Sequence, residues 1–258
     1  MLEYDFMRHA FAAAGIVAVL AGLVGYFLVL RGQAFAGHAL SHVGFAGATG
    51  AVLLGVSPLL GMLGVTVLGG IVMGALGEKL AQRDIAIGVI LTLSLGLGLL
   101  FLHFFTAYAT AATALLFGDV LGVDLPTIYE LAFLATLCLA VLGFISRPLL
   151  FASLSPELAE AKGVNLRLLG LVFLGLVGLT TAASAQIVGV LLVFALMIGP
   201  AATAQRLTTR IAPGLFLAAG LALTQAWSGI ALSYITDWPA SFWIATLSGG
   251  VYLLSLAA

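Results

Sequence analysis

Residues 12–30 read AAAGIVAVLAGLVGYFLVL and contain no charged side chain. An α-helix rises about 1.5 Å per residue, so roughly 20 apolar residues cross a hydrocarbon core about 30 Å thick. Eight further apolar runs, each bounded by charged residues, proline or glycine, follow at 37–56, 58–77, 86–104, 128–146, 167–185, 187–204, 213–235 and 240–257. The pattern predicts an all-α bundle of eight or nine transmembrane helices.

The composition of the whole chain supports the same fold class. Of its 258 residues, 63% are hydrophobic and 7% are charged, whereas an ordinary soluble domain has about 25% charged residues. A soluble fold of this length could not bury so much apolar surface. No long polar linker and no internal repeat divides the chain, so a single membrane domain is predicted over residues 1–258, with lipid as its surroundings and no nucleic-acid partner.

Glycines recur at helical spacing within several of the apolar runs. Gly70 and Gly74 are four residues apart, and Gly175 and Gly178 are three apart. Small residues on one helix face let two backbones approach closely in lipid. Their spacing predicts close helix packing.

The positive charges are segregated by the predicted topology. If the nine runs cross the membrane alternately, eight of the nine Lys and Arg residues lie on one side: Arg31, Lys79, Arg83, Arg147, Lys162, Arg167, Arg206 and Arg210. The positive-inside rule assigns that side to the cytoplasm. We therefore expect a bacterial inner-membrane protein with its N-terminus outside and its C-terminus in the cytoplasm. The more polar stretch 105–125 is expected to form a short helical or re-entrant element on the outer side.

A polar segment between two runs, SPELAEAKGVN at 155–165, is predicted to form a short cytoplasmic helix. Ser155 is expected to cap its first free N–H groups, and Pro156 suits the first helical position. Glu157 and Glu160 lie near the positive end of the helix dipole, and Gly163 suits the C-terminal end. The helix is either a solvated connection or a docking site for a cytoplasmic partner.

His38 and His42 are four residues apart, which places both imidazoles on one face of a helix. This spacing can chelate a transition metal ion, although intramembrane histidines also serve as hydrogen-bonded packing residues. The pair lacks the glutamate of a His-Glu-x-x-His metalloprotease, and the chain has no Gly-x-Ser-x-Gly nucleophile motif and no P-loop. We expect a transport subunit rather than an enzyme, with any ATP hydrolysis carried out by a separate subunit.

Four further polar residues are candidates for the transport pathway or for its outer mouth. His103 lies at the outer end of the fourth run, and Asp119 lies in the outer-side element. Thr181 and Gln186 interrupt an apolar stretch, where they could line a wet cavity or satisfy backbone groups. The sequence alone does not separate these roles from ordinary solvation and packing.

Several motifs in order along the chain resemble one known family. They are LVLR at 28–31 followed by GHALSH at 37–42, LFGDVLG at 116–122, SPELA at 155–159 with GVN at 163–165, and GVLLV at 189–193 leading to GPAATA at 199–204. Together they are similar to the membrane permeases of ATP-binding-cassette (ABC) importers for zinc, manganese or iron. The resemblance runs almost from end to end.

The resemblance implies a homodimer of permeases, two cytoplasmic ABC ATPases and an extracytoplasmic metal-binding protein. It also implies that Ser155, Pro156, Glu157, Glu160, Gly163 and Asn165 belong to a coupling helix for the ATPase, and that His38 and His42 lie on the metal path. The divalent ion is then cargo, with no permanently bound cofactor expected.

The family usually has aspartate at the position of His38, and imidazole in place of carboxylate favours Zn²⁺ over Mn²⁺. Zinc is therefore the favoured cargo, with manganese or iron as alternatives and a non-metal cargo also open. The rival class is a secondary transporter, which would need carboxylates within its spans. None lies clearly mid-span in this sequence.

Overall fold

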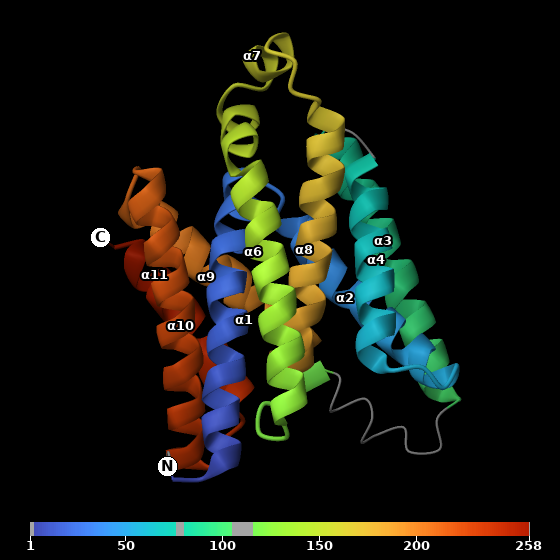
Figure 1. Cartoon of the computed structure of the whole chain (residues 1–258), viewed down its shortest axis with the longest axis vertical. Helices are drawn as coiled ribbons and strands as arrows, with labels where there is room; N and C mark the ends of the chain where they lie inside the picture. The colour runs from blue at the N-terminus through green and yellow to red at the C-terminus, as the bar shows by residue number, and fades with distance from the viewer. Residues whose placement is uncertain (1–2, 76–79, 105–115, 258) are drawn as a thin grey trace.

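The computed structural model describes residues 3–75, 80–104 and 116–257, and its regular structure in these ranges is entirely helical. Within these described ranges, the bundle (Figure 1) has nine helices: α1 (Asp5–Leu30), α2 (Ala34–Leu53), α3 (Pro58–Ala75), α4 (Leu80–His103), α6 (Leu125–Leu154), α8 (Leu166–Val188), α9 (Val190–Leu207), α10 (Ile211–Thr236) and α11 (Ala240–Ser255). A short helix, α7 (Pro156–Ala161), joins α6 to α8. Each of the nine predicted apolar runs forms one helix, which confirms the predicted fold class.

Seven of the described helices are long and apolar enough to cross a membrane by length and composition: α1, α3, α4 from Asp84 onward, α6, α8, α9 and α10. Of the other two, α11 has 16 residues. Helix α2 has 20 residues, but it carries two histidines among many alanines and glycines, which lowers its hydropathy. Helix α2, which bears the histidine pair, is thus one of the two bundle helices that do not meet this combination of length and hydropathy.

The long helices run along the long axis of the molecule (Figure 1). Helix α7 projects at one end of the bundle, and the N-terminus lies at the other end. Helices α1 and α8 are central, with 72% and 78% of their most apolar segments buried, whereas the corresponding segment of α4 is 17% buried. Because lipid tails are as apolar as a protein core, the outer helices can expose leucine, isoleucine and phenylalanine.

Glycines allow the closest contacts between helices. A β-carbon added to Gly178 of α8 would lie 2.5 Å from the carbonyl oxygen of Thr66 on α3, and one added to Gly74 of α3 would lie 2.9 Å from Cα of Leu171. Gly25 of α1 lies in the same way against the backbone of Met197 on α9. The predicted close packing is therefore present at Gly74 and Gly178.

Helix α6 is longer than its apolar run, which ends at residue 146. It continues through Arg147 and Pro148 to Leu154 and so carries α7 clear of the bundle (Figure 1). A charged residue marks the edge of the apolar run, but leucine and alanine beyond it remain good helix formers. At the other end, the Thr127 side chain and the Thr127 N–H, which donates to the Asp124 carboxylate at 3.0 Å, lower the pKa of Asp124 by hydrogen bonding.

We predict that Gly178→Ala lowers the thermal unfolding temperature of the detergent-solubilised protein, because overpacking a close contact costs about 1–3 kcal/mol. Gly175→Ala is the matched control on the same helix. Its added β-carbon would meet Ile71 at 3.8 Å, an ordinary contact, so no loss of stability is expected. Equal unfolding temperatures for the two variants would contradict the proposed role of Gly178.

Candidate functional site

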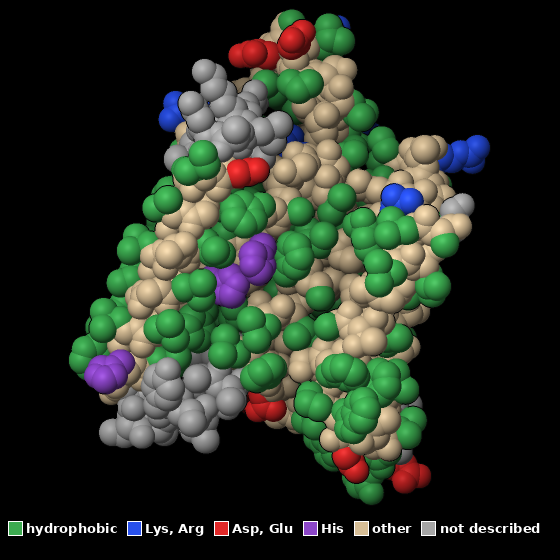
Figure 2. Space-filling view, turned by 180° about the vertical axis from the view of Figure 1, so that it is seen from behind, with side chains coloured by type: hydrophobic (Ala, Val, Ile, Leu, Met, Phe, Trp, Pro, Cys, Tyr) green, Lys and Arg blue, Asp and Glu red, His purple; other side chains and the backbone are tan. Residues whose placement is uncertain are grey.

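The two histidines of α2 lie side by side. The ring centroids of His38 and His42 are 4.9 Å apart, and the ring planes are nearly perpendicular, at 88°. Both side chains are half-buried. Figure 2 shows a pair of histidine side chains in the middle of one face of the molecule, surrounded mainly by hydrophobic side chains and distant from both ends of the bundle. The pair is thus partly exposed on this face, about midway between the two ends of the bundle.

The surroundings of the pair leave one nitrogen without a protein partner. Nδ1 of His42 is buried and forms no hydrogen bond within the described part of the chain. A buried polar atom without a partner costs about 1–3 kcal/mol, so this nitrogen suits a water molecule or a cation. The His38 ring meets the ring of Phe194 on α9, with centroids 5.0 Å apart.

Phe194 is a site residue that the sequence analysis did not identify. It fixes one side of the His38 ring through an edge contact between two helices that are far apart in the sequence. In the sequence it is one aromatic residue inside an apolar run, and nothing distinguishes it from a packing residue.

The histidine pair is not part of a larger cluster. No group of three or more His, Cys, Asp or Glu side chains able to hold a metal ion occurs among the residues described. A structural zinc site usually has four protein ligands. Among the residues that the structure describes, one chain therefore offers two imidazoles to a metal ion, which is an open and incomplete ligand set.

The predicted short helix is present as α7, but Ser155 does not cap it as expected. Ser155 is the N-cap residue, yet its side chain makes no capping hydrogen bond. Its backbone instead continues the end of α6, with the Ser155 N–H donating to the Phe151 carbonyl at 2.9 Å. Pro156 occupies the first helical position, and Gly163 has a φ of +85° where the chain turns after the helix.

Helix α7 presents its charged residues to solvent. Glu157, Leu158 and Glu160 are exposed, while Ala159 is fully buried against the bundle. Asn165 has a local role in the same connection, because its Oδ1 accepts a hydrogen bond from the Leu168 N–H at 2.9 Å and so caps α8. The six predicted coupling residues therefore lie together in one projecting connection.

The other four candidates each have contacts or surroundings of their own. His103 is exposed at the end of α4 and packs against Phe104. The Asp119 Oδ1 accepts a hydrogen bond from the Gly122 N–H at 2.9 Å, which stabilises a turn. Thr181 is buried and donates to the sulfur of Met197 at 3.9 Å, and Gln186 Oε1 is buried with no partner among the described residues.

The predicted outer-side element falls partly outside the described residues, at 105–115. Its described part packs through Gly118, whose φ is +76°, against the backbone of residues 187–189. Gly189, with a φ of +82°, separates α8 from α9. Because α8 begins beside α7 and runs away from it, this contact lies at the opposite end of the bundle.

The chain matches the ABC 3 transport family over residues 3–258. It is 31% identical to the manganese transport system membrane protein MntC of Halalkalibacterium halodurans, over 92% of this chain and 82% of the relative. It is 29% identical to the "probable iron transport system membrane protein" of Haemophilus influenzae, over 99% and 94%. Among solved structures it is similar to PsaBC from Streptococcus pneumoniae in complex with Fab, with a TM-score of 0.88, 25% identity and coverage of 99% and 92%.

We predict that Gly118→Ala increases amide hydrogen exchange of segment 116–124. A left-handed backbone destabilises alanine by about 1–2 kcal/mol, and the β-carbon of the substituted alanine would overlap the backbone of residues 187–189. Gly163→Ala is the matched control, because Gly163 also has a positive φ but no atom within 4 Å of an added β-carbon. The packing role of Gly118 is contradicted if exchange of this segment is the same in Gly118→Ala as in the unaltered protein.

Proposed function

Because the chain belongs to the ABC 3 transport family, we propose that it is the membrane permease subunit of an ATP-driven importer for a divalent transition metal ion. The observation that carries the proposal is the half-buried pair of imidazoles at mid-height in a membrane bundle (Figure 2). The sequence has no P-loop. ATP hydrolysis is therefore assigned to a separate ATPase subunit.

The geometry of the pair suits a transient stop for an ion. A transport site must bind its ion well enough to admit it and weakly enough to release it. The two imidazoles meet that condition, because no third His, Cys, Asp or Glu side chain joins them among the described residues. One of them also has a buried nitrogen without a partner there. A second copy of the chain facing this surface would add two more imidazoles, so we propose that the permease works as a homodimer with the ion path between its subunits.

The proposed cargo is zinc, with manganese or iron carried less well. The relatives described above are named for manganese and iron transport. In this chain, however, imidazole stands where the family usually has a carboxylate, at His38. Imidazole nitrogen suits borderline ions such as Zn²⁺, whereas Mn²⁺ prefers oxygen ligands.

The two ends of the bundle suit two different partners. We propose that α7 docks on the ATPase and that its end of the bundle is cytoplasmic, which leaves the N-terminus outside. This assignment is supported by Lys162 directly after α7 and by Arg31 and Arg167 beside it. The opposite end, which includes residues 116–122, then faces the extracytoplasmic metal-binding protein.

We predict that His42→Ala lowers zinc uptake by about tenfold or more in a reconstituted complex, because even an outer-sphere partner of a metal ligand is worth 10–100-fold. His38→Asp is expected to keep uptake but to shift the preference from zinc toward manganese, because it restores a hard oxygen ligand. Radiometal uptake at matched expression measures both effects.

His103→Ala is the matched control for these variants, since His103 is exposed at the end of α4 and belongs to no cluster with the pair. Its uptake is expected to equal that of the unaltered protein. If His42→Ala and His38→Asp both keep the original rate and ion preference, these histidines are not on the transport path.

We also predict that the double variant Glu157→Lys, Glu160→Lys no longer co-purifies with the cognate ATPase. Reversing two exposed charges on a helix of six residues replaces attraction by repulsion at the docking surface. Glu130→Lys, an exposed change at the far end of α6, is expected to keep the association. Normal assembly of the double variant would exclude α7 as the docking helix.

A further inference from the structure

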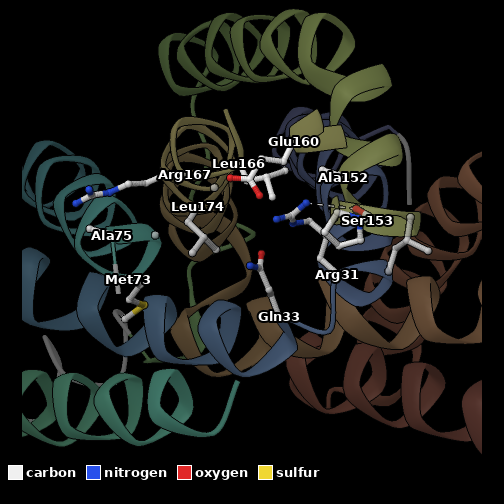
Figure 3. Close-up of a pocket in the computed structure, with 14 residues that line it drawn as sticks. Arg31, Gln33, Met73, Ala75, Ala152, Ser153, Glu160, Leu166, Arg167 and Leu174 are labelled. Atoms are coloured by element: carbon white, nitrogen blue, oxygen red, sulfur yellow. Dashed lines mark hydrogen bonds between the residues drawn. The ribbon is translucent and has the colours of Figure 1, made fainter. Parts of the chain in front are cut away.

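A cavity of about 700 Å³ lies between α7 and the bundle (Figure 3). We call it the coupling cavity. Its walls come from the α1–α2 turn, the ends of α3 and α6, helix α7 and the start of α8, and they include Arg31, Gln33, Ser153, Pro156, Glu160 and Leu174. The cavity therefore brings the proposed docking helix next to the turn that leads into the histidine-bearing helix α2.

Arg31 joins this turn to both helices that hold α7. Its Nη1 donates a hydrogen bond to Oγ of Ser153 at 3.3 Å, and its guanidinium carbon lies 5.7 Å from the centre of the Phe173 ring. Ser153 lies near the end of α6, three residues before α7 begins, and Phe173 lies on α8, which follows α7. A movement of α7 that shifts either helix therefore acts directly on the Arg31 side chain.

The Ser153 hydroxyl is itself held in place. Its Oγ donates to the Leu149 carbonyl at 2.6 Å while it accepts the bond from Arg31. The hydroxyl thus links the α6 backbone to the guanidinium with both of its hydrogen-bonding functions in use.

The turn that follows Arg31 is short and hydrogen-bonded. The turn between α1 and α2 consists of Arg31, Gly32 and Gln33, and the N–H of Gln33 donates to the Leu28 carbonyl at 2.9 Å. Gln33 is buried, and α2 begins at the next residue. His38 follows in the second turn of that helix, so a displacement of Arg31 reaches the imidazole pair through one tight turn and a short length of helix.

The charge across the cavity favours such a movement. Figure 3 shows the Arg31 guanidinium and the Glu160 side chain projecting into the coupling cavity from opposite walls. Glu160 is carried by α7. Opposite charges attract more strongly near a protein than in bulk water, and the cavity leaves room for α7 to approach the turn.

We infer that Arg31 transmits movement of α7 to α2 and thereby couples the ATPase to the histidine pair. Arg31 is a positioning residue in this scheme, because it acts on the ion path through α2 and does not itself bind cargo. The inference rests on the proposed function in one respect, namely that α7 is the element the ATPase moves.

The test uses a cysteine reporter at the ion path. Cys138 is the chain's one cysteine and is buried, so Cys138→Ala with His42→Cys leaves a single reporter thiol. Its labelling by a water-soluble maleimide is measured in the complex with the cognate ATPase, with and without vanadate-trapped nucleotide. With Arg31 present, trapping is expected to change the labelling rate by about fivefold or more, the usual lower range for coupling between two sites.

Arg31→Ala is expected to abolish this change while the ATPase traps nucleotide to the same extent. Arg31→Lys is expected to restore only part of it, because an ammonium lacks the flat fork that can bond Ser153 and lie over Phe173 together. Arg210→Ala, an exposed arginine in the α9–α10 turn, is the matched control and is expected to keep the full change.

Three results would overturn the inference. The first is a labelling rate that still responds to nucleotide in Arg31→Ala, and the second is a labelling rate that does not respond with Arg31 present. The third is loss of nucleotide trapping in Arg31→Ala, since Arg31 would then merely hold the docking helix in shape. The readout requires no metal ion, so a complex that fails to take up metal contradicts the proposed cargo without changing the result of this test.

Discussion

A backbone inside a bilayer has no water to bond with, and most features of this chain follow from that constraint. Its peptide groups must pair within each segment, and helices satisfy them. Some buried hydroxyls pair within their own helix in the same way: Thr49 donates to the Phe45 carbonyl at 2.9 Å, and Thr66 donates to the Met62 carbonyl at 2.7 Å. Other buried polar atoms have no partner among the described residues, including the hydroxyls of Thr180 and Ser184 and Nδ1 of His42, and each such atom costs stability.

The helices could be predicted from the sequence because hydrophobic length is a local property. Each of the nine apolar runs forms one helix in the described structure, and Gly74 and Gly178 lie close to the backbone of a neighbouring helix, as their spacing predicted. The errors arose where a boundary depends on more than hydropathy. Helix α6 passes through Arg147 and Pro148, and the capping expected of Ser155 is absent while Asn165 caps the next helix. Hydropathy marks the edge of the lipid, whereas capping depends on backbone angles that it does not report.

The candidate site, too, could be predicted from the sequence only in part. Four-residue spacing on one helix was enough to predict that His38 and His42 share a face. Phe194 and the contacts of Arg31 could not be predicted, because they depend on which helices pack together. Arg31 and Ser153 are 122 positions apart in the sequence. The family resemblance included Arg31 in its LVLR motif, but only the structure connects it to α6, α8 and the coupling cavity.

These contacts join the projecting helix α7, the turn at Arg31 and the imidazole pair one helical turn further along α2, and we propose that the three act as one mechanical unit. In this unit, the histidine pair is proposed to contact the transported ion. Zinc K-edge X-ray absorption on the permease–ATPase complex, loaded with zinc in the absence of the binding protein, tests it most directly. We expect imidazole scattering with zinc–nitrogen distances of about 2.0–2.1 Å, and we expect it to be lost when His38 and His42 are both replaced by alanine. A spectrum showing oxygen ligands alone, or one unchanged by that double replacement, would contradict it.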